Sequence, residues 1–83
     1  MAEIVIYTTK ICPYCIMAKR LLTQKGLSYT EINVEDPKLR EELIKKTNRR
    51  TVPQIYIGDV HVGGFDELYA LEQQKKLDAL VQS

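Results

Sequence analysis

The 83-residue chain has only two cysteines, one histidine and no excess of either charge, and each scarcity argues against a class of function. Its 12 basic and 11 acidic residues give a formal net charge of +1, which is too balanced for an electrostatic grip on nucleic acid or a membrane surface. No apolar run approaches the roughly 20 residues of a membrane span, and residues 1–8 lack the pattern of a signal peptide. We therefore expect a protein of the reducing cytoplasm, which recognises any charged ligand through local contacts.

The shortage of histidine and cysteine also argues against a zinc centre. A tetrahedral site needs four ligands, whereas this chain offers one pair of thiols and His61 on a predicted hairpin. Carboxylates or a second subunit would have to complete the shell. We expect no metal site, and we interpret His61 as a surface residue.

Local patterns predict one α/β domain over residues 1–83, with a single modest core. Residues 3–8 are almost continuously apolar, as in a central strand covered on both faces. Pro13 suits the first turn of a helix whose apolar stripe runs toward Gly26, and a second strand follows at 29–34. Because a helix joins these two strands, we expect them to be parallel.

The rest of the chain predicts a helix, a hairpin and a closing helix. The helix that follows the second strand begins at residues 36–37, an aspartate and a proline. Three apolar residues are expected to form its buried stripe: Leu39, Leu43 and Ile44. Strands at 53–57 and 60–62 flank a Gly-Asp turn, so they should form an antiparallel pair. A closing helix is expected over 65–81, with Tyr69 in its apolar pattern.

Both cysteines lie in the stretch Cys12-Pro13-Tyr14-Cys15, where the strand pattern gives way to the helical one. A pair at this spacing beside a βαβ pattern, in a protein without secretory features, is typical of a redox-active dithiol. A structural disulfide is the alternative, but closing so short a loop would stabilise the fold by only about 2 kcal/mol. We therefore predict that Cys12 and Cys15 interconvert between two thiols and a disulfide.

Cys12 is placed at the N-cap of the predicted helix and Cys15 one turn further, so both sulfurs share a face. Thiolate is the reactive form, and a cysteine of pKa about 8.5 is only about 3% ionised at pH 7, against about 90% for a pKa of about 6. Lowering the pKa this far requires that the thiolate be stabilised by about 3.4 kcal/mol. The helix dipole supplies about 1 kcal/mol of this, and hydrogen bonds from first-turn N–H groups supply the rest. We expect Cys12 to receive both and to form a stable thiolate that leaves easily.

Two further motifs follow the cysteine pair in order, Thr51-Val52-Pro53 and Gly63-Gly64-Phe65-Asp66. Together the three motifs make the chain resemble the glutaredoxins over essentially all 83 residues, above all the small dithiol type of bacteria. The resemblance implies a thioredoxin-like fold, with a four-stranded mixed sheet flanked by helices, and a cis peptide bond before Pro53. It also implies glutathione as co-substrate.

The resemblance further implies that the catalytic residues are Cys12 and Cys15 and that glutathione lies across Cys12. The implied glutathione contacts all belong to the three motifs: Tyr14, Thr51, Val52, Pro53, Gly64, Phe65 and Asp66. Glutathione is a short peptide with two carboxylates and one amine, so it can pair with the backbone of Val52 and place a carboxylate on the N–H groups of Phe65 and Asp66. The Asp66 side chain then meets the ammonium group of the ligand or serves as a helix N-cap.

Basic residues near these motifs have two interpretations, ligand contact or solvated helix end. Lys45 and Lys46 end a predicted helix and complement its dipole, so we interpret them as solvated. The roles of Lys10, Arg49 and Arg50 stay open, because each lies next to a motif without belonging to it.

These features predict a glutathione-dependent thiol–disulfide oxidoreductase that reduces glutathione mixed disulfides and protein disulfides. Its expected partners are glutathione and glutathionylated or disulfide-containing proteins, and we expect it to act as a monomer. Two alternatives remain open: a carrier that holds an iron–sulfur cluster between two subunits through Cys12 and glutathione sulfurs, and a redoxin reduced directly by thioredoxin reductase. Pro13 and Tyr14 disfavour the cluster, and the Gly63-Gly64 motif favours glutathione.

Overall fold

The computed structural model describes residues 2–82, so Met1 and Ser83, the two ends of the predicted domain, lie outside the described residues. Strands and helices follow one another in this order: β1 (Ile4–Thr8), α1 (Pro13–Gln24), β2 (Thr30–Asn33), α2 (Pro37–Thr47), β3 (Gln54–Ile57), β4 (Val60–Gly63), α3 (Phe65–Gln73) and α4 (Leu77–Gln82). The sheet has the strand order β2-β1-β3-β4, with β1 parallel to β2 and antiparallel to β3, and with β3 antiparallel to β4. The predicted parallel pair and hairpin are both confirmed.

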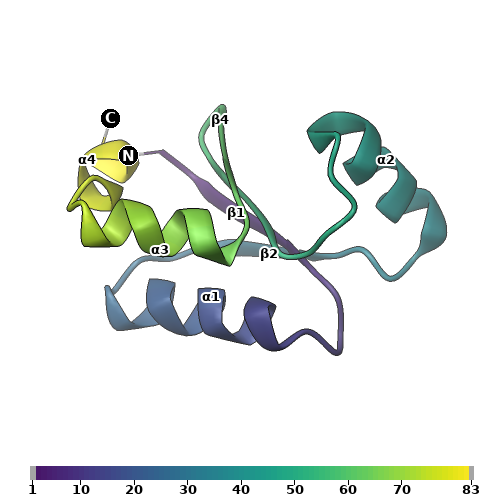
Figure 1. The fold of residues 1–83 in the computed structure, drawn as a ribbon, viewed down its shortest axis with the longest axis horizontal. Coiled ribbons are helices and arrows are strands. Elements are labelled where there is room, and N and C mark those ends of the chain that lie inside the picture. Colours follow the sequence, from purple (N-terminus) through teal and green to yellow (C-terminus); the bar gives the residue numbers. More distant parts are fainter. Residues whose placement is uncertain (1, 83) are drawn as a thin grey trace.

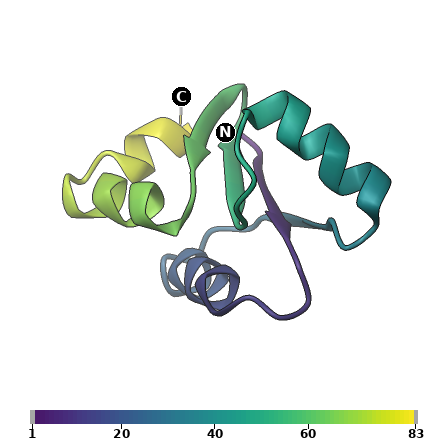
Figure 2. The same ribbon diagram turned by 45° about the vertical axis from the view of Figure 1, so that its right-hand side comes forward.

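The sheet separates α2 on one side from α1, α3 and α4 on the other (Figures 1 and 2). The core lies on the side of α1 and α3, where Ile6 and Ile55 of the two central strands pack with Leu22 and Leu68 of these helices. All four of these side chains are fully buried. On the other face, Lys46 of α2 lies over the sheet, so β1 is covered on both faces as its apolar sequence predicts.

The prediction that Leu39 is buried is wrong, because 40% of this residue is exposed. Leu43 and Thr47, one and two turns further along α2, are buried on the same stripe. Leu39 nevertheless faces the same way, because it lines an open cavity together with Ile32, Val34 and Leu43. The sequence pattern identifies the inward face of the helix, although Leu39 in its first turn is not buried.

The predicted closing helix is wrong in one respect, since it is divided into α3 and α4. Lys75 has φ 59°, and its N–H donates to the carbonyl oxygen of Glu72. This left-handed turn ends α3. Lys25 at the end of α1 then forms ion pairs with Glu72 and Asp78, at 2.8 Å and 3.2 Å, and so ties α1 to both helices. The N–H of Ala2 donates to the carbonyl oxygen of Val81 at 2.7 Å, which brings the two ends of the described chain together.

Candidate active site

The two cysteines occupy the start of α1, as predicted. Cys12 is the N-cap residue, with φ −154° and ψ 100°, and Pro13 is the first helical residue. The backbone N–H of Cys15 donates to Cys12 Sγ at 3.1 Å, and the two cysteines form a disulfide with a Cα–Cα distance of 5.2 Å. Cys12 is 8% exposed and Cys15 only 1%, so Cys12 is the more accessible residue of the pair.

The segment 51–53, just before β3, lies against this sulfur. The peptide bond between Val52 and Pro53 is cis, as the family resemblance implies. The carbonyl oxygen of Val52 lies 3.6 Å from Cys12 Sγ. A ligand bonded to Cys12 would therefore start beside the backbone of Val52.

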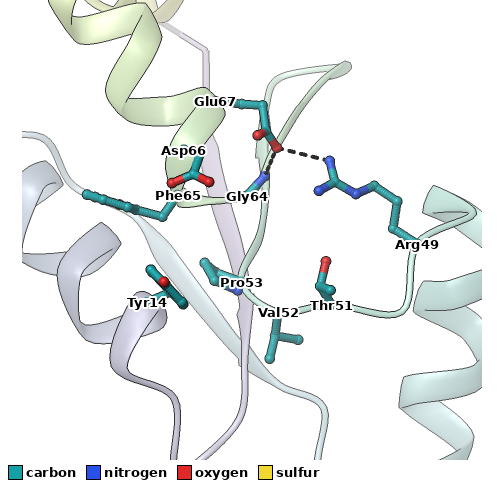
Figure 3. Close-up of a pocket in the computed structure, with 9 residues that line it drawn as sticks. All are labelled: Tyr14, Arg49, Thr51, Val52, Pro53, Gly64, Phe65, Asp66 and Glu67. Atoms are coloured by element: carbon teal, nitrogen blue, oxygen red, sulfur yellow. Dashed lines mark hydrogen bonds and ion pairs between the residues drawn. The ribbon is translucent and has the colours of Figure 1, made fainter.

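A cleft of about 210 Å³ opens next to this contact (Figure 3). It is lined by Tyr14 from the start of α1, by four residues before β3 and by four at the start of α3: Arg49, Thr51, Val52, Pro53, Gly64, Phe65, Asp66 and Glu67. All seven glutathione contacts that the resemblance implies are among these lining residues. The structure thus brings three segments, distant in sequence, to one cavity.

One side of the cleft is aromatic and the other is charged (Figure 3). The rings of Tyr14 and Phe65 stack with centroids 6.5 Å apart, and Tyr14 is 58% exposed. Across the cleft, Arg49 Nη1 pairs with Glu67 Oε1 at 3.0 Å. A ligand with an apolar stem and charged ends matches this arrangement.

Glu67 also caps α3, a role that the sequence analysis missed. Gly64 is the N-cap residue, and its N–H donates to Glu67 Oε1 at 2.7 Å. The interpretation of Asp66 as an N-cap is therefore wrong, because it lies inside the first turn. This hydrogen bond, followed by the one from Arg49, lowers the pKa of Glu67 below its usual range. A glutamate three residues after a helix start is the signal that could have identified this cap.

Other basic residues that the sequence analysis considered do not line this cleft. Lys45 pairs with Glu41 at 3.5 Å, one turn earlier on α2. Lys46 Nζ lies 4.4 Å from the centroid of the Tyr56 ring, so this lysine packs on the sheet and is not simply solvated. Lys10 and Arg50 are exposed outside the cleft, and Arg49 is the cation that the cleft contains.

His61 is more than a surface residue, which corrects the interpretation of its position on the hairpin. Its ring is partly buried and stacks on Tyr56 with centroids 4.9 Å apart. Its Nε2 lies 2.7 Å from Oε1 of the buried Gln54. Burial, followed by the positive charge of Arg49, lowers the pKa of His61.

Residues 2–82 contain neither a cluster of metal ligands nor a membrane-spanning helix. Histidine, cysteine, aspartate and glutamate side chains form no group of three or more that could hold a metal ion in this part of the chain. Within the same residues, every helix is too short or too polar to span a bilayer.

Comparison with known proteins identifies one family throughout. The Glutaredoxin family model matches residues 4–62. The chain is 55% identical over 84 residues to a glutaredoxin of Pseudomonas aeruginosa, with all of both chains covered. It is 48% identical over 83 residues to glutaredoxin 3 of Escherichia coli K12, with 99% of this chain and 100% of the relative covered.

Solved structures agree with these sequence matches. The solution structure of a glutaredoxin from Brucella melitensis superimposes with a TM-score of 0.88 at 51% identity, covering 98% of this chain and 89% of the other. A buckwheat glutaredoxin solved in complex with glutathione gives a TM-score of 0.89 at 29% identity, over 98% of this chain and 77% of the other. The likeness confirms the predicted thioredoxin-like fold.

Proposed function

Since the chain belongs to the glutaredoxin family and is a glutathione-dependent thiol–disulfide oxidoreductase, we propose that Cys12 is its nucleophile and that glutathione binds in the adjoining cleft. The observation that carries this proposal is the position of Cys12 Sγ. This sulfur accepts a hydrogen bond from the backbone N–H of Cys15 in the first turn of α1, and it lies against the carbonyl oxygen of Val52 at the edge of the cleft. Cys15 is more deeply buried and has no comparable access to a ligand.

In the reduced protein, the Cys12 thiolate attacks the glutathione sulfur of a mixed disulfide. A bond forms between Cys12 and glutathione, the bond to the substrate sulfur breaks, and the substrate thiolate leaves and takes a proton from water. A second glutathione thiolate then attacks the glutathione sulfur on Cys12. This step releases glutathione disulfide and returns the Cys12 thiolate, so electrons and atoms balance over the cycle.

The cleft offers a partner for each charged group of glutathione. The backbone of glutathione can form hydrogen bonds with the backbone of Val52, as a strand added to the edge of a sheet does. One carboxylate accepts from the first-turn N–H groups of Phe65 and Asp66, which have no acceptor within the helix. The Asp66 carboxylate meets the ammonium group, and Arg49 on the opposite side of the cleft is suited to the second carboxylate.

For protein disulfides, Cys15 would resolve the bond between Cys12 and the substrate by forming the internal disulfide. The variant Cys15→Ser should therefore keep its activity on a glutathionylated peptide and lose most of its activity on a protein disulfide. Cys12→Ser is the matched control and should lose both activities. Loss of both activities in Cys15→Ser would contradict this division of labour.

We also propose that residues 1–83 act as a single glutaredoxin domain and as a monomer, with glutathionylated and disulfide-containing proteins as substrates. Two coupled assays with the same substrate test the electron source. Turnover is expected with glutathione and glutathione reductase. Turnover with thioredoxin reductase alone would instead favour a redoxin that needs no glutathione.

A further inference from the structure

A buried amide side chain, that of Gln54, connects His61 of β4 to Thr51 at the cleft. Gln54, the first residue of β3, is fully buried and lies outside the cleft lining. Its Nε2 donates to the carbonyl oxygen of Thr51 at 2.9 Å and to Thr51 Oγ1 at 3.2 Å. A residue on the cleft is thus held from inside the protein.

These contacts determine which groups donate. The carbonyl oxygen of Thr51 can only accept, so the amide nitrogen of Gln54 must face it. Oε1 of Gln54 therefore faces His61, and at 2.7 Å His61 must donate from Nε2. The stack of His61 on Tyr56 holds the imidazole ring in place.

We propose that His61 is a positioning residue which, through Gln54, holds the segment 51–53 in the geometry that binds glutathione. The inference rests on the proposed function, because it assumes that the backbone of Val52 pairs with glutathione. A buried acceptor that loses its donor seeks another one. Without His61, the Gln54 amide can turn away from Thr51, and the carbonyl and N–H groups at Val52 then lose their fixed direction.

The effect should fall on binding more than on chemistry. His61 lies on β4, outside the residues that line the cleft, whereas the sulfur of Cys12 and its N–H donor belong to the start of α1. Removing the donor of His61 should therefore raise KM and leave kcat nearly unchanged. A residue that only supports overall stability would produce no such split.

Two variants separate the hydrogen bond from the ring stack. His61→Phe keeps an aromatic ring on Tyr56 and removes the donor, whereas His61→Gln loses the ring and keeps an N–H close to the position of Nε2. Val60→Thr, at the exposed neighbouring residue, is the control. The substrate is a peptide with one glutathionylated cysteine, and the assay uses glutathione and glutathione reductase.

We expect His61→Phe to raise KM by about fivefold with kcat within about twofold of the parent, and His61→Gln to recover most of the lost affinity despite a lower melting temperature. An unchanged KM in His61→Phe, or an equal loss in both variants, would overturn the proposal. Failure of the proposed function would be recognised separately in the same assay, because Cys12→Ser would then keep its turnover.

A measurement on the unaltered protein does not depend on whether a variant folds. Nitrogen-15 NMR of the imidazole should show the Nε2–H tautomer, with slow exchange of this proton. An Nδ1–H tautomer would leave Gln54 without its donor and would also overturn the proposal.

Discussion

Gly63 offers the sharpest test of how the cleft is held, because an added methyl group would strike the pair formed by Arg49 and Glu67. Gly63 has φ +115°, a conformation that side chains rarely adopt. A Cβ atom built there collides with Glu67 Oε1 and lies 3.1 Å from Glu67 Cγ and from Arg49 Nη1. The change Gly63→Ala must therefore displace the side chains that cap α3 and line the charged side of the cleft.

Three costs add up in this variant. Backbone strain at the positive φ contributes about 1–3 kcal/mol, loss of the cap at Gly64 about 1 kcal/mol, and loss of the partly exposed ion pair about 0.5 kcal/mol. The expected loss of unfolding free energy is about 2.5–4.5 kcal/mol. Gly26→Ala is the matched control, because Gly26 has φ +72° with no atom within 4 Å of an added Cβ, so only strain of about 1–2 kcal/mol applies.

Urea denaturation followed by circular dichroism measures both variants. The midpoint should fall much further for Gly63→Ala than for Gly26→Ala, with similar slopes if the unfolded states are alike. The KM for a glutathionylated peptide should rise only in Gly63→Ala, since only that change disturbs the cleft. Equal midpoints and equal KM values would refute the role assigned to Arg49 and Glu67.

Three further predictions concern acid stability, the active sulfur and the core. Because the pKa of Glu67 is lowered, its carboxylate stabilises the fold at neutral pH and loses this effect as the pH falls below about 4. In urea denaturation, Glu67→Gln should therefore lower the unfolding free energy by about 1 kcal/mol at pH 7 and by little at pH 3. An equal loss at both pH values would contradict this. In Cys15→Ser, ultraviolet absorbance should show that the Cys12 thiolate forms at a lower pH in the folded than in the unfolded chain, whereas coincident titrations would remove the case for activation by the start of α1. Leu22→Ala should lower the unfolding free energy by about 2–5 kcal/mol, against less than about 0.5 kcal/mol for the exposed Thr23→Ala, and calorimetry compares the two.

Local chemistry explains why much of this fold could be predicted from sequence. The N-cap position of Cys12 follows from a proline that opens a helix directly after a strand pattern. The antiparallel hairpin follows from turn residues between two short strands. The cis bond before Pro53 is different, because only the resemblance to a family implied it.

What sequence could not provide depends on distances across the fold. Arg49 and Glu67 are separated by 18 residues and meet only because β3 and β4 fold back on each other. His61 gains its partners in the same way, since Tyr56 lies opposite it on the neighbouring strand. The left-handed conformation of Lys75 is also invisible, because an amphipathic pattern continues on both sides of it.

The hydrogen bond between Ala2 and Val81 has a practical consequence for protein engineering. Figure 1 shows α4 near the end of α1, whereas Cys12 lies at the start of that helix. This domain could therefore be inserted into a surface loop of a host protein, because its two ends would join the host chain at adjacent points. In such a chimaera the reactive thiol would face outward, away from the host.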